Sequence, residues 1–117
     1  MDFDADIIPL IGFGFAGGIG NTGAVCGAVA GAAMAISLKL GRVGSMEEGF
    51  KTFTVIQEFR RRFEEEMGAF TCRDLTGLDL TSKDVQQLMS SDIPQKICFP
   101  AVATAYRLAV ELLKEKT

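Results

Sequence analysis

The chain has 117 residues, of which 48% are hydrophobic and 23% charged, and its formal net charge at pH 7 is −3. This length suits one domain with its own hydrophobic core, and we expect residues 1–117 to form a single helical domain. The acidic balance argues against a nucleic-acid partner. The chain has no histidine, which excludes a Ser-His-Asp triad, a Cys-His dyad and a Cys/His zinc site within it.

A long uncharged stretch, Ile7 to Leu38, raises the possibility of a membrane span. Pro9 and the glycines between Gly12 and Gly23 interrupt it, and the longest remaining part, Ala24–Leu38, falls short of the ~20 apolar residues that a spanning helix needs. The acidic N-terminus also lacks the positive charge of a signal peptide. We therefore expect a soluble, cytoplasmic protein with no membrane span, and keep a role at a membrane surface as a minor alternative.

The sequence predicts an all-α fold, a compact bundle of about four to five helices with a glycine-rich loop before the central helix. Asp2–Ile11 are expected to form a short helix or helix remnant, ended by Pro9 and by the glycines that follow, and Gly12–Gly23 are expected to form the loop. Asn21 or Thr22 then caps a helix that runs to Leu40 and ends at Gly41.

That second helix is expected to be the most buried in the fold. Gly23, Gly27 and Gly31 recur every four residues beside several alanines, a pattern that lets another helix backbone approach closely. We expect that leucine in place of Gly27 or Gly31 would be severely destabilising, because overpacking at such a contact has nowhere to relax.

The clearest helix opens at a capping box, Ser45-Met-Glu-Glu48, and ends at Gly68. Its apolar residues, spaced three or four apart, are expected to face the central helix: Met46, Phe50, Phe53, Ile56, Phe59, Phe63 and Met67. Three arginines, 60–62, and three glutamates, 64–66, predict three ion pairs at i, i+4 on its surface.

The C-terminal part predicts two short helices and one long one. Thr71 and Thr81 each precede an aspartate by three residues and resemble caps for helices over Cys72–Leu75 and Ser82–Met89. The final helix starts at Asp92, Pro94 or Pro100 and continues to about Lys116. One of its faces is expected to carry Cys98, Val102, Ala105, Ala109 and Leu112.

Two patterns that suggest other chemistry are weak. The glycine-rich loop matches the dinucleotide fingerprint Gly-x-Gly-x-x-Gly twice, starting at Gly12 and at Gly18. No strand precedes either match and no acidic residue follows at the required distance, so nucleotide binding is disfavoured. Paired carboxylates such as Glu47-Glu48 fall on an expected exposed face, which gives no support to acid/base catalysis.

The three cysteines, Cys26, Cys72 and Cys98, allow two interpretations. Free cysteine is often a small buried hydrophobe, so all three can be plain core residues. Yet each falls near a predicted helix start, where the positive end of the helix dipole lowers a thiol pKa and favours the reactive thiolate. This second interpretation predicts one shared site.

A run of motifs resembles a known family. Residues Phe15 to Gly20, then Cys26-Gly-Ala-Val-Ala-Gly31, are similar to the small redox-active proteins of the C_GCAxxG_C_C type, which carry four cysteines and are related to a domain of split-Soret cytochromes. Later residues also agree with this family: Gly68, Cys72, Arg73, Leu75, Gly77 and Cys98.

The resemblance implies electron transfer or redox sensing by thiols that hold an iron–sulfur cluster. The family's first cysteine, on an N-terminal helix, has no counterpart here, which implies either a shortened chain without that helix or a member that has lost its cluster. Three thiolates leave one position of a four-cysteine cluster without a protein thiolate.

Two functions follow as expectations, and the sequence leaves open whether the protein is an enzyme. The first is a redox module in which Cys26, Cys72 and Cys98 act as redox-active thiols or metal ligands, and in which glycines approach the cofactor: Gly17, Gly18, Gly20 and Gly27. The second is a non-catalytic helical interaction or scaffold protein with structural cysteines. Either suits a homo-oligomer, most simply a dimer, and a redox partner protein is a further expectation of the first.

The two functions are distinguished by distance. We predict that at least two cysteine pairs have Cα separations under about 10 Å, with Cys72 close to Cys26, because a small cluster confines its sulfur ligands. The shared pocket is predicted to open toward the space of the family's N-terminal helix, and the thiols are predicted to react with a maleimide in the native state.

Overall fold

A computed structural model describes residues 6–40, 44–78, 81 and 84–116, and these are mostly helical. Helices make up 77% of the described residues, which form no strand, so the all-α prediction is confirmed. In chain order the elements are α1 (Ile7–Gly12), the 3₁₀ turn η1 (Phe13–Phe15), α2 (Gly27–Leu40), α3 (Met46–Met67), α4 (Cys72–Thr76), α5 (Asp84–Ser90), the π-helical turn η2 (Pro94–Cys98) and α6 (Phe99–Lys116).

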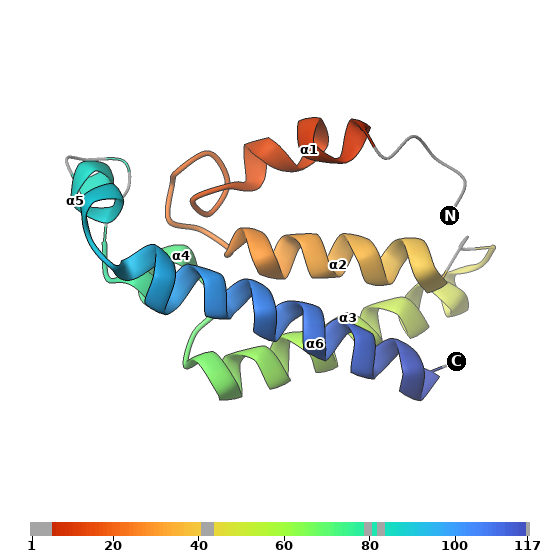
Figure 1. Cartoon of the computed structure of the whole chain (residues 1–117). Coiled ribbons are helices and arrows are strands. Elements are labelled where there is room, and N and C mark those ends of the chain that lie inside the picture. The colour runs from red at the N-terminus through yellow and green to blue at the C-terminus, as the bar shows by residue number, and fades with distance from the viewer. Residues whose placement is uncertain (1–5, 41–43, 79–80, 82–83, 117) are drawn as a thin grey trace.

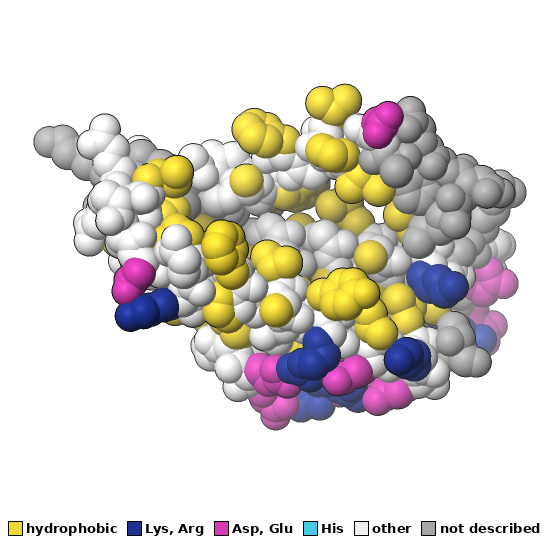
Figure 2. All heavy atoms as spheres, viewed as in Figure 1, with side chains coloured by type: hydrophobic (Ala, Val, Ile, Leu, Met, Phe, Trp, Pro, Cys, Tyr) yellow, Lys and Arg dark blue, Asp and Glu magenta, His cyan; other side chains and the backbone are white. Residues whose placement is uncertain are grey.

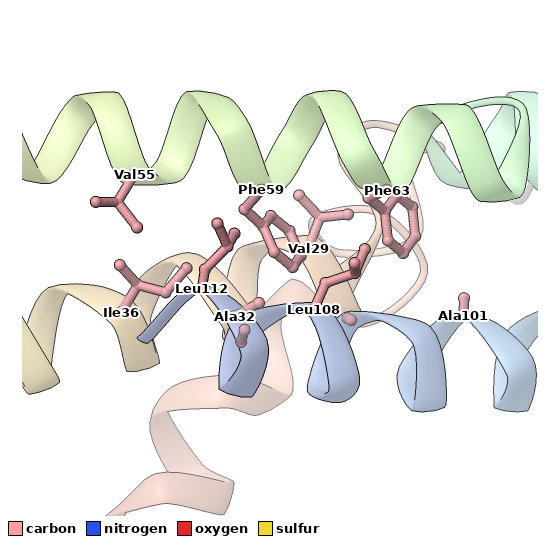
Figure 3. Packing of buried hydrophobic residues seen from close by; sticks show 11 residues of the cluster. Val29, Ala32, Ile36, Val55, Phe59, Phe63, Ala101, Leu108 and Leu112 are labelled. Carbon is pink, nitrogen blue, oxygen red and sulfur yellow. The ribbon is translucent and has the colours of Figure 1, made fainter. Parts of the chain in front are cut away.

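The core lies between α2, α3 and α6 (Figure 1). Phe59 and Phe63 of α3 stack with ring centroids 6.0 Å apart and point toward the other two helices (Figure 3). Val29 of α2 and Leu108 of α6 lie opposite these rings, and Ile36 lies opposite Val55 with no exposed surface (Figure 3). Helix α1 lies along α2 on the side away from this core, and α4 and α5 gather at the opposite end from the chain termini (Figure 1).

Helix α1 differs in its extent from the N-terminal helix that the sequence predicted. Within the described residues it begins at Ile7, runs through Pro9 and continues past Gly12 into η1. Pro9 does not end the helix because it occupies the first turn, where its missing N–H would have no partner in the helix. The glycine-rich loop therefore begins after Phe15 rather than at Gly12.

Helix α2 begins at Gly27, later than the cap predicted at Asn21 or Thr22. The Thr22 hydroxyl donates instead to the carbonyl of Gly18, 2.7 Å away, within the loop. The predicted end at Gly41 lies outside the described residues.

Helix α2 is not the most buried helix, which corrects another expectation. It buries Val29, Ala32 and Ile36, whereas α6 buries Ala101, Ala105, Leu108, Ala109 and Leu112. A Cβ added at Gly31 would meet no atom within 4 Å, so the close helix contact predicted there is absent. The same addition at Gly27 would come within 3.1 Å of the Phe15 carbonyl oxygen.

Helix α3 has the predicted bounds, Met46–Met67. The Ser45 hydroxyl accepts a hydrogen bond from the Glu48 N–H, and Gly68 ends the helix with a φ of 85°. Only part of the predicted apolar stripe is buried, however. Phe59 and Phe63 enter the core, while the residues of the first two turns are mostly exposed, at 74% for Met46, 57% for Phe50 and 56% for Phe53.

The charged run on α3 forms two of the three predicted ion pairs. Arg60 pairs with Glu64 and Arg61 with Glu65. The third predicted pair, Arg62 with Glu66, is replaced by other contacts of these two residues. Arg62 pairs with Glu58, one turn earlier on α3, and with Glu115 of α6, and Glu66 pairs with Arg107 of α6. The contacts with Glu115 and Arg107 connect α3 to α6.

The C-terminal elements largely follow the prediction. The Thr71 hydroxyl caps α4 by accepting from the Asp74 N–H, and Gly77 ends the helix with a φ of 74°. Helix α5 covers most of the second predicted short helix, whose first two residues lie outside the described part. The final helix starts at Pro94 as the turn η2 and then continues as α6, with Val102 57% exposed on the face expected to be apolar. Among the described residues, no helix is long and apolar enough to cross a membrane.

Candidate redox site

An isolated antiparallel bridge between Val25 and Thr71 fixes the positions of two cysteines. The Cys26 N–H donates to the Phe70 carbonyl at 2.8 Å, and the Cys72 N–H donates to the Ala24 carbonyl at 2.7 Å. The two cysteines are therefore diagonal neighbours on the same side of the bridge, since side chains alternate along extended chain. Diagonal positions on such a ladder have a spacing of about 7–8 Å.

The glycine-rich loop packs on this bridge with an uncommon backbone. Five consecutive residues have positive φ: Gly17 (64°), Gly18 (73°), Ile19 (64°), Gly20 (63°) and Asn21 (59°). The Gly18 carbonyl accepts from the Ala24 N–H at 3.0 Å, which ties the loop to the bridge. A Cβ built on Gly18 would lie 2.8 Å from the Cys72 Cβ, so glycine is required for this approach.

The third cysteine reaches the same place from the other end of the chain. Cys98 ends η2 and joins Cys26 and Cys72 in the lining of one pocket of about 220 Å³. Three of the four glycines predicted to approach a cofactor, Gly17, Gly18 and Gly27, line this pocket too, whereas Gly20 is absent from its lining. The remaining wall is mostly apolar and includes Leu75, Leu88, Ile97 and Ala101.

The helix-start expectation holds for two of the three cysteines. Cys26 directly precedes α2, and its carbonyl accepts from the Val29 and Ala30 N–H groups. Cys72 is the first residue of α4. Cys98 instead lies inside a continuous helical run, where the next N–H, that of Phe99, is bonded to the Pro94 carbonyl.

The expected lowering of the thiol pKa values is wrong for two cysteines. Burial raises the pKa of Cys72, and the nearby thiols of Cys98 and Cys26 raise it further, while a hydrogen bond from Thr76 opposes the change. Burial also raises the pKa of Cys98, with a smaller contribution from Cys26. Loss of water outweighs the helix dipole here because Cys72 is only 9% exposed. The same mutual influence indicates that the three thiols are near neighbours.

The donor set fits a metal group only in its chemistry. Thiolate sulfur is the usual protein ligand of iron–sulfur clusters. In the described part of the chain, however, no three Cys, Asp or Glu side chains are placed to hold a metal ion. The pocket as it stands is a cluster of thiols, of which Cys72 and Cys98 have raised pKa values, rather than a ready set of metal ligands.

These features agree with the comparison with known families. The chain matches the family described as "Putative redox-active protein (C_GCAxxG_C_C)" over residues 1–112 and belongs to it. No curated protein and no solved structure matches the chain. Family membership gives a redox-active class of protein and leaves the cofactor and partner to be inferred.

The sequence did not reveal the bridge or the apolar wall of the pocket. Val25 and Thr71 are a β-branched pair of the kind that favours extended pairing, but two residues give no alternating pattern. Leu88 and Ile97 come from separate helices, and only the tertiary fold brings them to the cysteines.

Proposed function

We propose that this protein is a redox module that transfers electrons through Cys26, Cys72 and Cys98. The observation that carries the proposal is the shared pocket, because its three thiols are 46 and 26 residues apart in the sequence. Three cysteines without a shared role would have no reason to line one small cavity beneath a strained glycine-rich loop. This argument favours the redox module over a scaffold with structural cysteines.

Thiol–disulfide exchange is the chemistry that needs least beyond the chain itself. Two of the thiols lose two protons and two electrons and form a disulfide, while a disulfide of the partner protein gains them and becomes two thiols. A disulfide needs Cα atoms closer than about 7 Å, so the diagonal pair Cys26 and Cys72 would have to move slightly, and Cys98 is the alternative partner of either. A reducing cytoplasm would return the module to the dithiol form.

An iron–sulfur cluster is the second candidate, and the presence of a third cysteine favours it. Two thiols suffice for disulfide exchange, whereas an iron–sulfur cluster is usually held by four thiolates. Cys26, Cys72 and Cys98 would be its ligands after a rearrangement of their side chains, since the described residues contain no group already placed to hold a metal ion, and a ligand from outside this set would complete it. The cluster would supply one-electron chemistry in place of thiol exchange.

One set of measurements tests the proposal. The reduced protein is titrated with oxidised glutathione under argon, and intact mass and free-thiol counts are followed for the wild type and for each single Cys→Ser variant. Formation of one internal disulfide that is lost in two of the three variants supports exchange and identifies the pair. A parallel sample is treated with iron and sulfide, and a visible charge-transfer spectrum that all three variants weaken supports the cluster. The redox proposal fails if no internal disulfide forms and no spectrum develops.

A further inference from the structure

The surface beside the cysteine pocket is a second feature that the redox chemistry does not explain. Helix α2 presents Gly27, Gly31 and Ala35 as a strip of small residues along its outer side, and this strip is the floor of two apolar grooves. One groove, of about 410 Å³, lies between α2 and α6, and the other, of about 680 Å³, lies between α2 and α1. Figure 2 shows hydrophobic side chains along the hollow that these two grooves form, while charged side chains gather mainly along the edge of the molecule opposite to the grooves.

Bulky apolar side chains stand beside the hollow. On α6, Phe99, Val102 and Tyr106 are 62%, 57% and 73% exposed, and they follow one another by three and four residues. Val102 and Tyr106 also form the wall of the groove over α2. One face therefore carries both a ridge of large residues and a furrow of small ones.

We propose that a second copy of this chain docks on this face, so that the α6 ridge of each copy fills the α2 furrow of the other. A two-fold symmetric interface uses the same patch on both copies, and the patch must be complementary to itself. A ridge and a furrow side by side meet that condition. The stretch Ile97–Tyr106 carries no charge, nor does any of α2 before Lys39, so like charges do not oppose the contact.

The exposed area also agrees with a missing partner. The chain exposes 7719 Å², whereas a folded monomer of 12.6 kDa is expected to expose about 6,200 Å². The excess is larger than the ~800 Å² that each partner contributes to a standard interface. An amphipathic ridge with an exposed tyrosine is also typical of interface centres.

Docking would cover the cysteine pocket, because the two sites share walls. Gly27, Ala28 and Val102 line both the α2–α6 groove and the thiol pocket. A partner seated on the groove thus covers the side of the pocket that these residues form. This part of the inference rests on the proposed function only in taking the pocket as the place of thiol chemistry.

Sedimentation equilibrium of the reduced protein over a wide concentration range tests the interface. Gly31→Arg places a long charged side chain where a Cβ meets nothing within 4 Å, so the monomer can accommodate it while the docked partner cannot. Ser37→Arg is the matched control, since Ser37 is exposed on α2 outside both grooves. We expect a dimer for the wild type and the control, and a dimer constant weakened about tenfold or more for Gly31→Arg.

Further measurements keep the test decisive. Circular dichroism checks that each variant folds. If Gly31→Arg does not fold, Tyr106→Lys takes its place as the test variant. Maleimide labelling of Cys26 and Cys98 is expected to slow as the dimer forms. A monomeric wild type, a Gly31→Arg protein that remains dimeric, or a control that dissociates would overturn the proposal. A monomer whose native mass spectrum shows a bound apolar molecule would assign the grooves to that ligand instead.

The test separates this inference from the redox proposal. Repeating the sedimentation with Cys72→Ser leaves the interface intact but removes one thiol. A dimer that persists in a protein with no redox activity would support the interface and count against the redox function alone.

Discussion

At the scale of single residues, the approach of Gly18 to Cys72 decides how closely the loop covers the thiols. A Cβ on Gly18 would lie 2.6 Å from both the N and O atoms of Ala24, as well as 2.8 Å from the Cys72 Cβ. We expect Gly18→Ala to lower the free energy of unfolding by at least about 2 kcal/mol, because it adds a clash with backbone to the cost of a positive φ. Gly20→Ala is the control. Its φ is also positive but its Cβ would meet nothing, so a loss of about 1 kcal/mol is expected in urea unfolding.

The thiol of Cys72 should titrate at higher pH than an exposed thiol, because burial and the neighbouring thiols raise its pKa. Labelling with iodoacetamide should therefore reach half of its maximal rate at a pH above ~8.5, the value at which an ordinary thiol is half ionised. Since the folded state holds the proton more tightly than the unfolded state, stability should fall as pH rises above ~8.5. Denaturant unfolding across this pH range checks the slope, and a Cys72→Ala protein with the same slope would contradict the assignment.

The residues that line the pocket were predictable only in part, and the thiol pKa values of Cys72 and Cys98 were not. The Cys26 motif and its resemblance to a family marked all three cysteines and most of the lining glycines. The direction of the pKa change depends on burial by Leu88, Ile97 and other residues distant in sequence, so helix position alone predicted it wrongly for Cys72 and Cys98. Gly20 could not be separated from Gly18, because both share the same local pattern.

At the scale of elements, α3 offers a direct comparison between buried and exposed phenylalanines. Phe59 has no exposed surface and stacks on Phe63, whereas Phe53 is 56% exposed. We expect Phe59→Ala to cost about 3–5 kcal/mol, the range for a large core truncation. Phe53→Ala should change the free energy of unfolding by only about 0.5 kcal/mol, as surface changes usually do. Thermal and urea unfolding of the two variants measure the difference. An equal loss of unfolding free energy in both would show that Phe53 is buried in a contact that the monomer lacks.

The ends of elements were easier to predict than their buried faces. Ser45 and Gly68 carry local signals for the start and end of α3, and both were correct. The apolar spacing of α3 covers more of its circumference than α2 and α6 can bury, so spacing could not tell Phe53 from Phe59. The start of α2 was missed because a tertiary bridge with Thr71 holds residues 24–26 extended against their helical preference.

At the scale of the whole molecule, acid stability should depend on Glu58. Hydrogen bonds from Arg61 and Arg62 lower the pKa of Glu58 to about 2, and Arg62 also reaches Glu115 of α6. Because the folded pKa lies below the unfolded value of about 4.3, the stabilisation is present above pH ~4.3 and is lost as pH falls toward 2. Glu58→Gln should therefore flatten the loss of stability over this range. Urea unfolding at several acidic pH values measures it, and an unchanged pH dependence would contradict this role.

The sequence indicated a helical bundle but not which of its faces lacks a cover. Periodicity shows that α2 and α6 are apolar, and it cannot tell core from interface. The small residues of α2 were expected inside the bundle, and Gly27, Gly31 and Ala35 instead line open grooves. Helix α1 lies along α2 but leaves a groove between the two helices, and periodicity cannot predict this placement.

The meeting of three distant cysteines also links the redox state of the protein to the entropy of its unfolded chain. A disulfide between any two of them would close a ring of 26, 46 or 72 residues. Because ring closure depends only on the logarithm of ring size, each bond would remove a similar conformational freedom, worth about 4 kcal/mol. Marginal stabilities of about 5–15 kcal/mol are typical of small domains. The oxidised chain would thus resist thermal unfolding and proteolysis far better than the reduced one. The redox potential of its surroundings would therefore determine how long the folded protein persists.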